Sequence, residues 1–419
     1  MVRDALIVQK REWERRLAEP YVERKVASSF ARAGDMIRVV VGPRRAGKSF
    51  FALHTLGRTG DCGYVNFDDE RLLGLSDYDE LLHAVDAIYD SPETLLLDEI
   101  QNLSQWELFV NRLQRQGRRL MVTGSNAHLL SSELATHLTG RHLLIPILPF
   151  SFEETLRIAS KRLTKAERKD CLETYVQDGG FPEPLLKQID RTEYLRTLTQ
   201  AVLYKDIVKR HRIRAVQGLE DLARYLFSNV AKEYSYQALA RVTRCRSVNT
   251  VEKYVRHLEE AFLFFSLRRF SFKVREQAAY NKKIYCVDNG LALAMGFRFR
   301  GDRGRLYENL VAVALWKRRL NHAIEVFFWR NAQNEEVDFV IQEGTRVEAL
   351  IQVCQRVDDP RVLDREIRAL LKAGKELRCR NLFILSEERE DTESFEWFGI
   401  KGRIQFVPLW RWLLESEAV

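Results

Sequence analysis

The octapeptide Gly42–Ser49 constrains the fold of this chain more than any other segment. It fits the phosphate-binding pattern GxxxxGK(S/T) at every position. The β-branched run at residues 37–41 before it is typical of a strand buried on both faces of a parallel sheet, and residues 50–56 after it favour a helix. A strand, a glycine-rich loop and a helix in this order predict an α/β fold with a nucleotide phosphate site.

The chemistry of phosphate binding explains the spacing within this loop. Two glycines let the backbone curl, so that its N–H groups face the phosphates at the positive end of the following helix. Lys48 would reach the β- and γ-phosphates, and the hydroxyl of Ser49 would bind Mg²⁺. The residues that we expect to bind the nucleotide are Gly42, Pro43, Arg44, Arg45, Ala46, Gly47, Lys48, Ser49 and Phe50.

A second motif follows about 50 residues later, where the apolar strand Thr94–Leu97 ends in two acids. Ligands of an α/β sheet bind at the carboxyl ends of its parallel strands. Asp98 would hold Mg²⁺ through water, and Glu99 would polarise the attacking water. The alternative is a strand that simply ends in two solvated acids. A further strand at Tyr64–Phe67, together with Glu99 directly after Asp98, indicates the hydrolytic branch of these folds.

The next predicted strand, residues 119–122, also ends in polar residues. Ser125 is our first candidate for a side chain that senses the γ-phosphate, and Thr123 is the second. A turn that caps the following helix is the alternative. After that helix, Arg141 precedes another predicted strand, residues 142–148.

Together these motifs resemble one family, the bacterial and archaeal AAA-type ATPases that carry a C-terminal domain of unknown function. The resemblance covers nearly the whole chain and rests on the segments Gly42–Ser49, Leu97–Asn102, Thr123–Ala127, Gly140-Arg141, Pro149–Phe152, Gly179–Glu183, Leu203–Ile207, Tyr285–Leu291 and Glu336–Val340. It implies Mg²⁺-dependent hydrolysis of ATP by a ring-forming homo-oligomer, at an interface between subunits.

Two single residues take their expected roles from this resemblance. Arg141 occupies the place of the arginine that reaches a neighbour's γ-phosphate, where it neutralises charge on the transferred group. The alternative is an ordinary surface arginine. Pro182 resembles the proline that rests against the adenine in the small helical domain, and a simple loop turn is the alternative.

Composition excludes several classes of protein. With 419 residues, of which 46% are hydrophobic and 30% charged, the chain is neither disordered nor fibrous and is long enough for two to three domains. Its longest apolar stretch, residues 143–150, is shorter than a membrane span and contains two prolines, and residues 1–4 lack the apolar region of a secretory signal. We expect a soluble, cytoplasmic protein with no membrane partner.

The motifs divide the chain into five predicted parts, which together define the expected fold class. It is an α/β P-loop NTPase with a parallel sheet and a helical lid, followed by a winged-helix-like domain and a restriction-endonuclease-like α/β domain. The parts are an N-terminal helical lead (1–33), the ATPase core (34–150), the lid (151–205), the winged-helix-like domain (206–300) and the nuclease-like domain (301–419).

The winged-helix-like part carries the candidate contacts to DNA. Residues 236–242 and a helix capped by Ser247 form a helix-turn-helix pattern, and residues 262–267 and 268–273 could form the strands of a wing. Basic residues interleaved with aromatic ones suit nucleic acid, although a solvated basic face or a structural module is the alternative. The candidates are Asn249, Lys253, Arg256, Arg268, Arg269 and Lys273.

The last part resembles the PD-(D/E)xK nuclease core in its order of helix and strands. A helix bears Glu308, and Asp338 fits the metal-binding aspartate. Gln352 stands where the glutamate is expected and Cys354 where the lysine is expected, and neither supplies the chemistry of the residue it replaces. We therefore expect a degenerate module that holds DNA or a partner without cutting.

Two functional hypotheses follow. The first is an oligomeric ATPase that acts on DNA as a motor or in remodelling. The second is an ATP-dependent switch that controls assembly with a protein partner in signalling, defence or toxin control. A metal-dependent nuclease is a distant third.

Overall fold

The fold is described from a computed structural model of the 419-residue chain. The described residues are 1–26, 34–57, 60–125, 138, 141–159, 163–187, 189–243, 245, 247–296, 303–321, 324–355 and 357–416. The chain forms two compact units. The first comprises Met1–Pro149 with Glu260–Phe262, and the second comprises Phe150–Glu259 with Leu263–Val419. Among the helices of the described ranges, none is long and apolar enough to cross a membrane.

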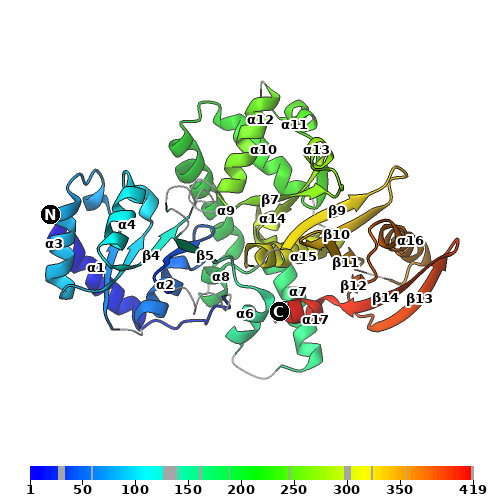
Figure 1. The fold of residues 1–419 in the computed structure, drawn as a ribbon, viewed down its shortest axis with the longest axis horizontal. Coiled ribbons are helices and arrows are strands. Elements are labelled where there is room, and N and C mark those ends of the chain that lie inside the picture. Colours follow the sequence, from blue (N-terminus) through cyan, green and yellow to red (C-terminus); the bar gives the residue numbers. More distant parts are fainter. Residues whose placement is uncertain are drawn as a thin grey trace. The chain divides into compact units, whose positions relative to one another are not determined.

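A parallel sheet forms the centre of the first unit, as the sequence predicts. The order of its five described strands is β2-β3-β4-β1-β5, and every neighbouring pair is parallel. The strands are β1 (Ile37–Val41), β2 (Cys62–Asn66), β3 (Thr94–Asp98), β4 (Arg119–Gly124) and β5 (His142–Pro146). Helices α1 (Val2–Leu17), α2 (Lys48–Gly57), α3 (Tyr78–Tyr89) and α4 (Trp106–Arg115) pack around it (Figure 1).

Buried apolar side chains hold α1 and α2 against this sheet. Phe51 and Leu56 of α2 pack with Val40 of β1 and with Met121 of β4 in one core cluster. Trp13 of α1 joins the same cluster. The side chain of Gln9 also donates hydrogen bonds to the backbone oxygen of Asn66 and to the carboxylate of Asp69. The N-terminal helical segment is therefore an integral layer of the first unit.

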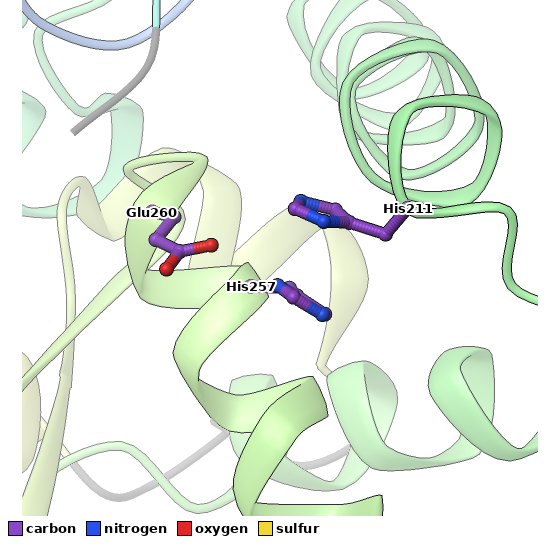
Figure 2. Close-up of side chains that lie close together, drawn as sticks. All are labelled: His211, His257 and Glu260. Atoms are coloured by element: carbon purple, nitrogen blue, oxygen red, sulfur yellow. The ribbon is translucent and has the colours of Figure 1, made fainter. Parts of the chain in front are cut away.

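Helices with well-defined caps begin the second unit. Ser151 and Glu154 form a capping box at the start of α6 (Phe152–Ile158), and Thr164 and Glu167 form another at α7 (Lys165–Asp178). The helices that follow are α8 (Pro182–Leu186), α9 (Arg191–Ala201), the π-helix η5 (Val202–Lys209), α10 (Val216–Ser228), α11 (Tyr236–Val242) and α12 (Val248–Glu260). The ring of His211, just after η5, stacks on that of His257 in α12 (Figure 2).

The two helices of the predicted helix-turn-helix pattern are present as α11 and α12. The Ser247 hydroxyl accepts the Thr250 N–H at the start of α12, and the predicted stripe of Val251, Tyr254, Val255 and Leu258 is buried. The predicted second wing strand at residues 268–273 is wrong. Residues 268 and 269 end strand β7 (Phe264–Arg269), the short helix α13 (Val274–Ala279) follows, and β8 (Lys282–Cys286) is the antiparallel partner of β7.

One sheet runs through most of the second unit. The order of its nine described strands is β13-β14-β12-β11-β10-β9-β7-β8-β6. The remaining strands are β6 (Lys232–Tyr234), β9 (Ile324–Arg330), β10 (Glu336–Glu343), β11 (Arg346–Val353), β12 (Leu382–Ser386), β13 (Asp391–Trp397) and β14 (Ile400–Pro408). Strands β7 and β9 join in a short parallel pair, Arg268↔Phe327 and Arg269↔Phe328. The sheet thus continues across residue 300, where the sequence suggests a domain boundary.

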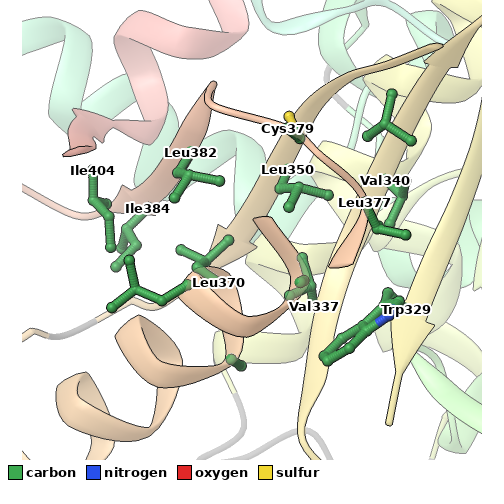
Figure 3. Close-up of a cluster of buried hydrophobic side chains, with 14 of the residues drawn as sticks. Trp329, Val337, Val340, Leu350, Leu370, Leu377, Cys379, Leu382, Ile384 and Ile404 are labelled. Carbon is green, nitrogen blue, oxygen red and sulfur yellow. The ribbon is translucent and has the colours of Figure 1, made fainter. Parts of the chain in front are cut away.

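The C-terminal half of this sheet has its own core. Leu370 and neighbouring residues of α16 (Pro360–Glu376) pack on Val337, Leu350 and Ile384 of three strands (Figure 3). The other described helices here are α14 (Asn289–Met295), α15 (Arg303–Asn321) and α17 (Leu409–Ser416). The order α15-β9-β10-β11-α16 confirms the helix and strand order predicted for residues 306–373.

Candidate functional site

The loop between β1 and α2 has the shape that a phosphate cradle requires. Gly42 has φ +153°, and a Cβ atom at this residue would lie 1.9 Å from the carbonyl oxygen of Ile147. The N–H of Ile147 donates in turn to the oxygen of Val41 at 2.7 Å. Gly47 has φ +93° and leads directly into α2. Both glycines of the motif therefore have backbone conformations that other residues rarely adopt.

Two basic side chains are buried around this loop. The ammonium of Lys48 donates to the carbonyl oxygen of Pro43 at 2.9 Å, so the lysine side chain lies along the phosphate-binding loop. Arg24, in the segment before β1, donates to the carbonyl oxygens of Ala46, at 2.8 Å, and of Leu148. Arg24 was missed by the sequence analysis, because an isolated arginine outside any motif gives no signal of such a contact.

Asp98, at the end of β3, lies against the first turn of α2. The Ser49 hydroxyl donates to its Oδ1 at 2.9 Å, the Tyr64 hydroxyl donates to its Oδ2 at 3.2 Å, and the Thr123 hydroxyl donates as well. Burial, and then the adjacent Glu99 carboxylate, raise the pKa of Asp98 above its ordinary value. A hydroxyl and a carboxylate side by side are the oxygen ligands that Mg²⁺ prefers, so the residues present fit the ion.

Glu99 is held in a fixed orientation next to Asp98. Its backbone has φ +51°, and its N–H donates to the Thr123 hydroxyl at 3.0 Å. Its carboxylate accepts from the Ser125 hydroxyl at 3.2 Å and from the side-chain amide of Gln101. Burial acts to raise the pKa of Glu99, but Lys48 and these hydrogen bonds outweigh burial and hold the pKa below its ordinary value. Glu99 is therefore ionised, as a group that polarises water must be.

The structure thus brings together most residues of the predicted site. Ser49, Asp98, Glu99, Thr123 and Ser125 are linked by hydrogen bonds at the carboxyl ends of β3 and β4. Around the loop itself, Pro43 and Ala46 are buried and Arg44 and Phe50 are half-buried, whereas Arg45 is exposed with φ +66°. The ring centroid of Phe50 lies 5.5 Å from that of His54 on the same helix, with the two planes tilted by 33°.

Arg141 lies at the opposite end of the sheet strands. It is exposed and directly precedes β5, and its carbonyl oxygen accepts from the N–H of Ile37, the first residue of β1. The P-loop follows the last residue of β1. A strand of this length spans about 16 Å at 3.3 Å per residue, so Arg141 is remote from the phosphate loop of its own chain. Its role at a neighbour's site stays a prediction.

Pro182 belongs to a turn that is anchored within the second unit. The N–H of Gly180 donates to the carboxylate of Asp288 at 2.6 Å, and the carbonyl oxygen of Gly180 accepts from the N–H of Phe150 at 2.7 Å. A Cβ atom at Gly180 would lie 2.0 Å from the oxygen of Phe150. Burial raises the pKa of Asp288 to about 6. These contacts give the Gly179–Pro182 motif a structural reason for its glycines, and adenine binding by Pro182 stays a prediction.

The candidate DNA contacts fall into two groups. Asn249, Lys253 and Arg256 are exposed on α12. Arg268 and Lys273 are exposed at and after the end of β7. Arg269 differs from all of them, because its guanidinium lies 4.2 Å from the ring centroid of Tyr280 and donates to the carbonyl oxygen of Arg330 at 2.6 Å. Its described contacts are structural.

His211, His257 and Glu260 lie close together near α12, so their nitrogen and oxygen atoms could be metal ligands. The ring centroids of His211 and His257 are 3.6 Å apart and the planes differ by 19°, while Glu260 follows His257 by three residues (Figure 2). A metal ion lies in the plane of each imidazole that binds it, about 2 Å from the nitrogen. The lone pairs of two parallel stacked rings do not converge on such a point, so this arrangement is a ring stack.

In the C-terminal module, Glu308 and Asp338 lie together, as the nuclease-like pattern predicts. Both contact the ammonium of Lys283, which the sequence analysis did not single out. Gln352 instead donates to Glu366 at 2.6 Å. Cys354 is buried, and burial raises the pKa of its thiol to about 11. A neutral thiol confirms that this position supplies no positive charge.

Comparisons with known protein families match three segments of the chain. Residues 35–156 match the AAA domain, residues 169–301 match a domain of unknown function (DUF8612), and residues 303–405 match another (DUF4143). The chain is 34% identical over 402 residues to the uncharacterized protein MJ1544 of Methanocaldococcus jannaschii, covering 91% of this chain and 88% of that protein.

Two further similarities are more distant. An uncharacterized protein of Haemophilus influenzae is 28% identical over 335 residues, which cover 75% of this chain and 81% of the relative. The solved structure of the Walker-type ATPase PABY2304 of Pyrococcus abyssi is 14% identical with a TM-score of 0.41, over 66% of this chain and 98% of that chain.

Proposed function

The chain belongs to the protein family that includes MJ1544 of Methanocaldococcus jannaschii. Because residues 35–156 match the AAA domain, we propose that the chain is a Mg²⁺-dependent ATPase whose active site is the P-loop. The observation that carries the proposal is the linked set of Ser49, Asp98 and Glu99 beside a loop whose first glycine has no room for a side chain. This set supplies hydroxyl and carboxylate oxygens together with an ionised acid.

Each residue of the set has a separate task. The backbone N–H groups of residues 42–49 and the ammonium of Lys48 bind the phosphates, and Ser49 and Asp98 hold the ion. Mg²⁺, when bound with ATP, neutralises charge on the phosphoryl group. Glu99 orients the attacking water and accepts its proton, with its carboxylate positioned by Gln101 and Ser125. Thr123 fixes the backbone of Glu99 relative to Asp98.

Release of phosphate from ATP tests this proposal. The full-length protein should hydrolyse ATP only when Mg²⁺ is present, and chelation of the ion should abolish the activity. Lys48→Ala should weaken nucleotide binding at least tenfold, because it removes the cation that faces the β- and γ-phosphates. Lys25→Ala, a charge change outside the loop, is the control and should hydrolyse normally. Hydrolysis at the wild-type rate by Lys48→Ala would place the activity elsewhere.

We further propose that the ATPase works as a homo-oligomer in which Arg141 completes a neighbour's site. The support is its exposure and its place at the end of the strands opposite to the end from which the P-loop of its own chain begins. Mixing Arg141→Ala with Glu99→Gln tests action between subunits. If Arg141 acts on a neighbour, mixed assemblies regain part of the activity that both variants lack. If Arg141→Ala alone hydrolyses like the wild type, the proposal fails.

DNA is the proposed substrate of this ATPase. The element order α10-β6-α11-α12-β7-α13-β8, with β8 between β6 and β7, supports this proposal because it resembles a winged helix with α12 as the recognition helix and α13 inserted between the wing strands. Exposed Asn249, Lys253 and Arg256 on α12 could approach bases and phosphates. Exposed Arg268 and Lys273, next to the 72%-exposed ring of Phe272, extend the same basic character.

The rate of ATP hydrolysis with and without duplex or branched DNA, at about 50 and about 200 mM salt, tests this substrate. DNA should raise the rate, and the effect should fade with salt because phosphate contacts release counterions. The double variant Lys253→Ala/Arg256→Ala should lose most of the stimulation, whereas Lys375→Ala/Arg380→Ala removes the same charge elsewhere and should keep it. A slow rate that ignores every DNA favours the alternative, an ATP-dependent switch that assembles with a protein partner. That alternative predicts that a non-hydrolysable ATP analogue changes the mass of the assembly.

A further inference from the structure

A buried lysine in the second unit faces three carboxylates at once. The side chain of Lys283, on β8, is only 3% exposed. Its Nζ lies 2.6 Å from Glu336 Oε1, 2.9 Å from Glu308 Oε1 and 3.2 Å from Asp338 Oδ1. The acids come from α15 and β10, so one ammonium collects oxygens from two elements that are distant from it in sequence.

The distances to Glu336 and Glu308 are those of hydrogen bonds from a charged donor, and the contact to Asp338 at 3.2 Å is longer. An N⁺–H···O⁻ bond is about 2.7–2.9 Å long, whereas Mg²⁺ binds oxygen at about 2.1 Å. The site also contains features that suit an ammonium: the Nζ lies 5.6 Å from the ring centroid of Phe328, and the Tyr285 hydroxyl donates to Glu308 at 2.8 Å. The second oxygen of Asp338 accepts from the N–H of Val353 at 2.9 Å.

The remaining polar groups nearby already have partners within the protein. Gln352 uses both ends of its amide, because its oxygen accepts from the N–H of Asp338 at 3.2 Å and its nitrogen donates to Glu366 at 2.6 Å. Glu366 is also paired with the guanidinium of Arg365, with Nε 3.1 Å from Oε1. Gln352 therefore offers no oxygen toward the Lys283 site, and Glu366 has a cation of its own.

A divalent metal does not fit this site in the presence of Lys283, since the ammonium occupies the point at which the carboxylates converge. We propose that Lys283 is the permanent cation of the site, standing in the place of the metal ion that the nuclease-like pattern implies. The module then needs no metal to hold its acids together. The ammonium also ties β8 to α15 and β10 across the short β7–β9 pair that joins the two halves of the sheet.

Removal of the Lys283 ammonium should open this site to a metal ion. Glu336 is 29% exposed, so an ion from solvent has access to the edge of the site once the ammonium is gone. Removing the side chain of Lys283 beyond Cβ leaves three carboxylates around one space, which is a ligand set that Mn²⁺ takes. Lys283→Met removes the charge but keeps the length of the chain, so the space stays filled.

Mn²⁺ titration of the nucleotide-free, full-length protein, followed by electron paramagnetic resonance, tests the proposal. The wild type should hold no Mn²⁺ that depends on Asp338, so that Asp338→Asn titrates like the wild type. Lys283→Ala should gain one site at least tenfold tighter than any in the wild type, and its melting temperature should rise with added Mn²⁺. Lys283→Met and Lys283→Ala/Asp338→Asn should lack this site.

Two results would overturn the assignment. One is a wild-type Mn²⁺ site that Asp338→Asn abolishes, because metal and ammonium would then share the site. The other is a folded Lys283→Ala variant without the new site. If Lys283→Ala does not fold without metal, the wild-type and Asp338→Asn titrations still decide the first question, and refolding of Lys283→Ala in Mn²⁺ decides the second.

Discussion

Substitution of the first glycine of the P-loop gives the most quantitative prediction of this structure. In Gly42→Ala, the added Cβ would lie 1.9 Å from the carbonyl oxygen of Ile147, more than 1 Å inside an ordinary contact. The obstacle is backbone, and the same residue donates its N–H to Val41 at 2.7 Å. The clash therefore cannot be relieved by turning a side chain, and the β1–β5 pair must separate where the phosphate loop begins.

Three contributions lower the free energy of unfolding of Gly42→Ala. A non-glycine residue at φ +153° costs about 1–3 kcal/mol, a weakened hydrogen bond about 1 kcal/mol, and overpacking about 1–3 kcal/mol. Together they amount to about 3–7 kcal/mol, which is a large part of the stability of an ordinary domain, about 5–15 kcal/mol. At about 2–4 °C per kcal/mol for a unit of this size, the melting temperature should fall by about 6–28 °C.

Scanning calorimetry measures this effect, with the transition of the first unit identified as the one that ATP shifts upward. Gly117→Ala is the matched control, because Gly117 has φ +85° but nothing within 4 Å of an added Cβ. It should cost only about 1 kcal/mol, the price of the left-handed backbone alone. A Gly42→Ala protein that melts like the wild type and binds a fluorescent ATP analogue normally would refute the steric reasoning.

Three further predictions concern single side chains. Tyr64→Phe removes a hydrogen-bond donor to buried Asp98 and should lower the free energy of unfolding by about 1–3 kcal/mol. Denaturant titration measures this change, and an unchanged free energy would show that the Tyr64–Asp98 hydrogen bond does not stabilise the fold. Arg24→Ala leaves the carbonyl oxygen of Ala46 in the nucleotide loop, and that of Leu148 after β5, without this donor. It should weaken both stability and ATP binding, with Arg24→Lys intermediate, and equal behaviour of the two variants would argue against the contact. Burial raises the pKa of Asp288 to about 6 in the folded protein, above the value in the unfolded chain. Between these two pKa values the folded state binds a proton that the unfolded state has lost. The free energy of unfolding should therefore fall by about 3 kcal/mol as pH rises from about 4 to about 6. Asp288→Asn should lack this contribution, and an unchanged pH profile in that variant would contradict it.

The nucleotide site could be predicted because its signals are local. Eight consecutive residues specify the loop, and Asp98 and Glu99 end an unmistakable apolar strand. The helix-turn-helix was equally visible, since the capping serine and the buried stripe of α12 lie within 12 residues of each other. Local pattern and tertiary structure agree at these places.

The errors and omissions have a common physical cause, which is contact between residues far apart in the chain. Lys283 meets Glu308 and Asp338 across 25 and 55 residues, so no spacing rule could bring them together. Arg24 reaches Leu148 across 124 residues. The second wing strand was misplaced because the chain turns after β7, where the Ser271 hydroxyl accepts the N–H of Lys273, and then forms α13, so that the returning strand is β8.

Arg269 illustrates the same limit for charge patterns. A basic cluster in the sequence is the same whether its members face solvent or the protein. The structure places Arg268 outside and turns Arg269 onto Tyr280, because neighbouring residues of β7 point to opposite faces of the sheet.

The most direct test of the proposed ATPase is the rate of ATP hydrolysis by Glu99→Gln at saturating Mg²⁺ and ATP. The substitution keeps the shape of the side chain and leaves Ser49 and Asp98 in place, so nucleotide binding should stay within about threefold of wild type while the rate falls by about 10²–10⁴-fold. Glu107→Gln, on α4 outside the site, should hydrolyse normally. If Glu99→Gln binds ATP and hydrolyses it at the wild-type rate, Glu99 does not activate the water and the central claim is contradicted.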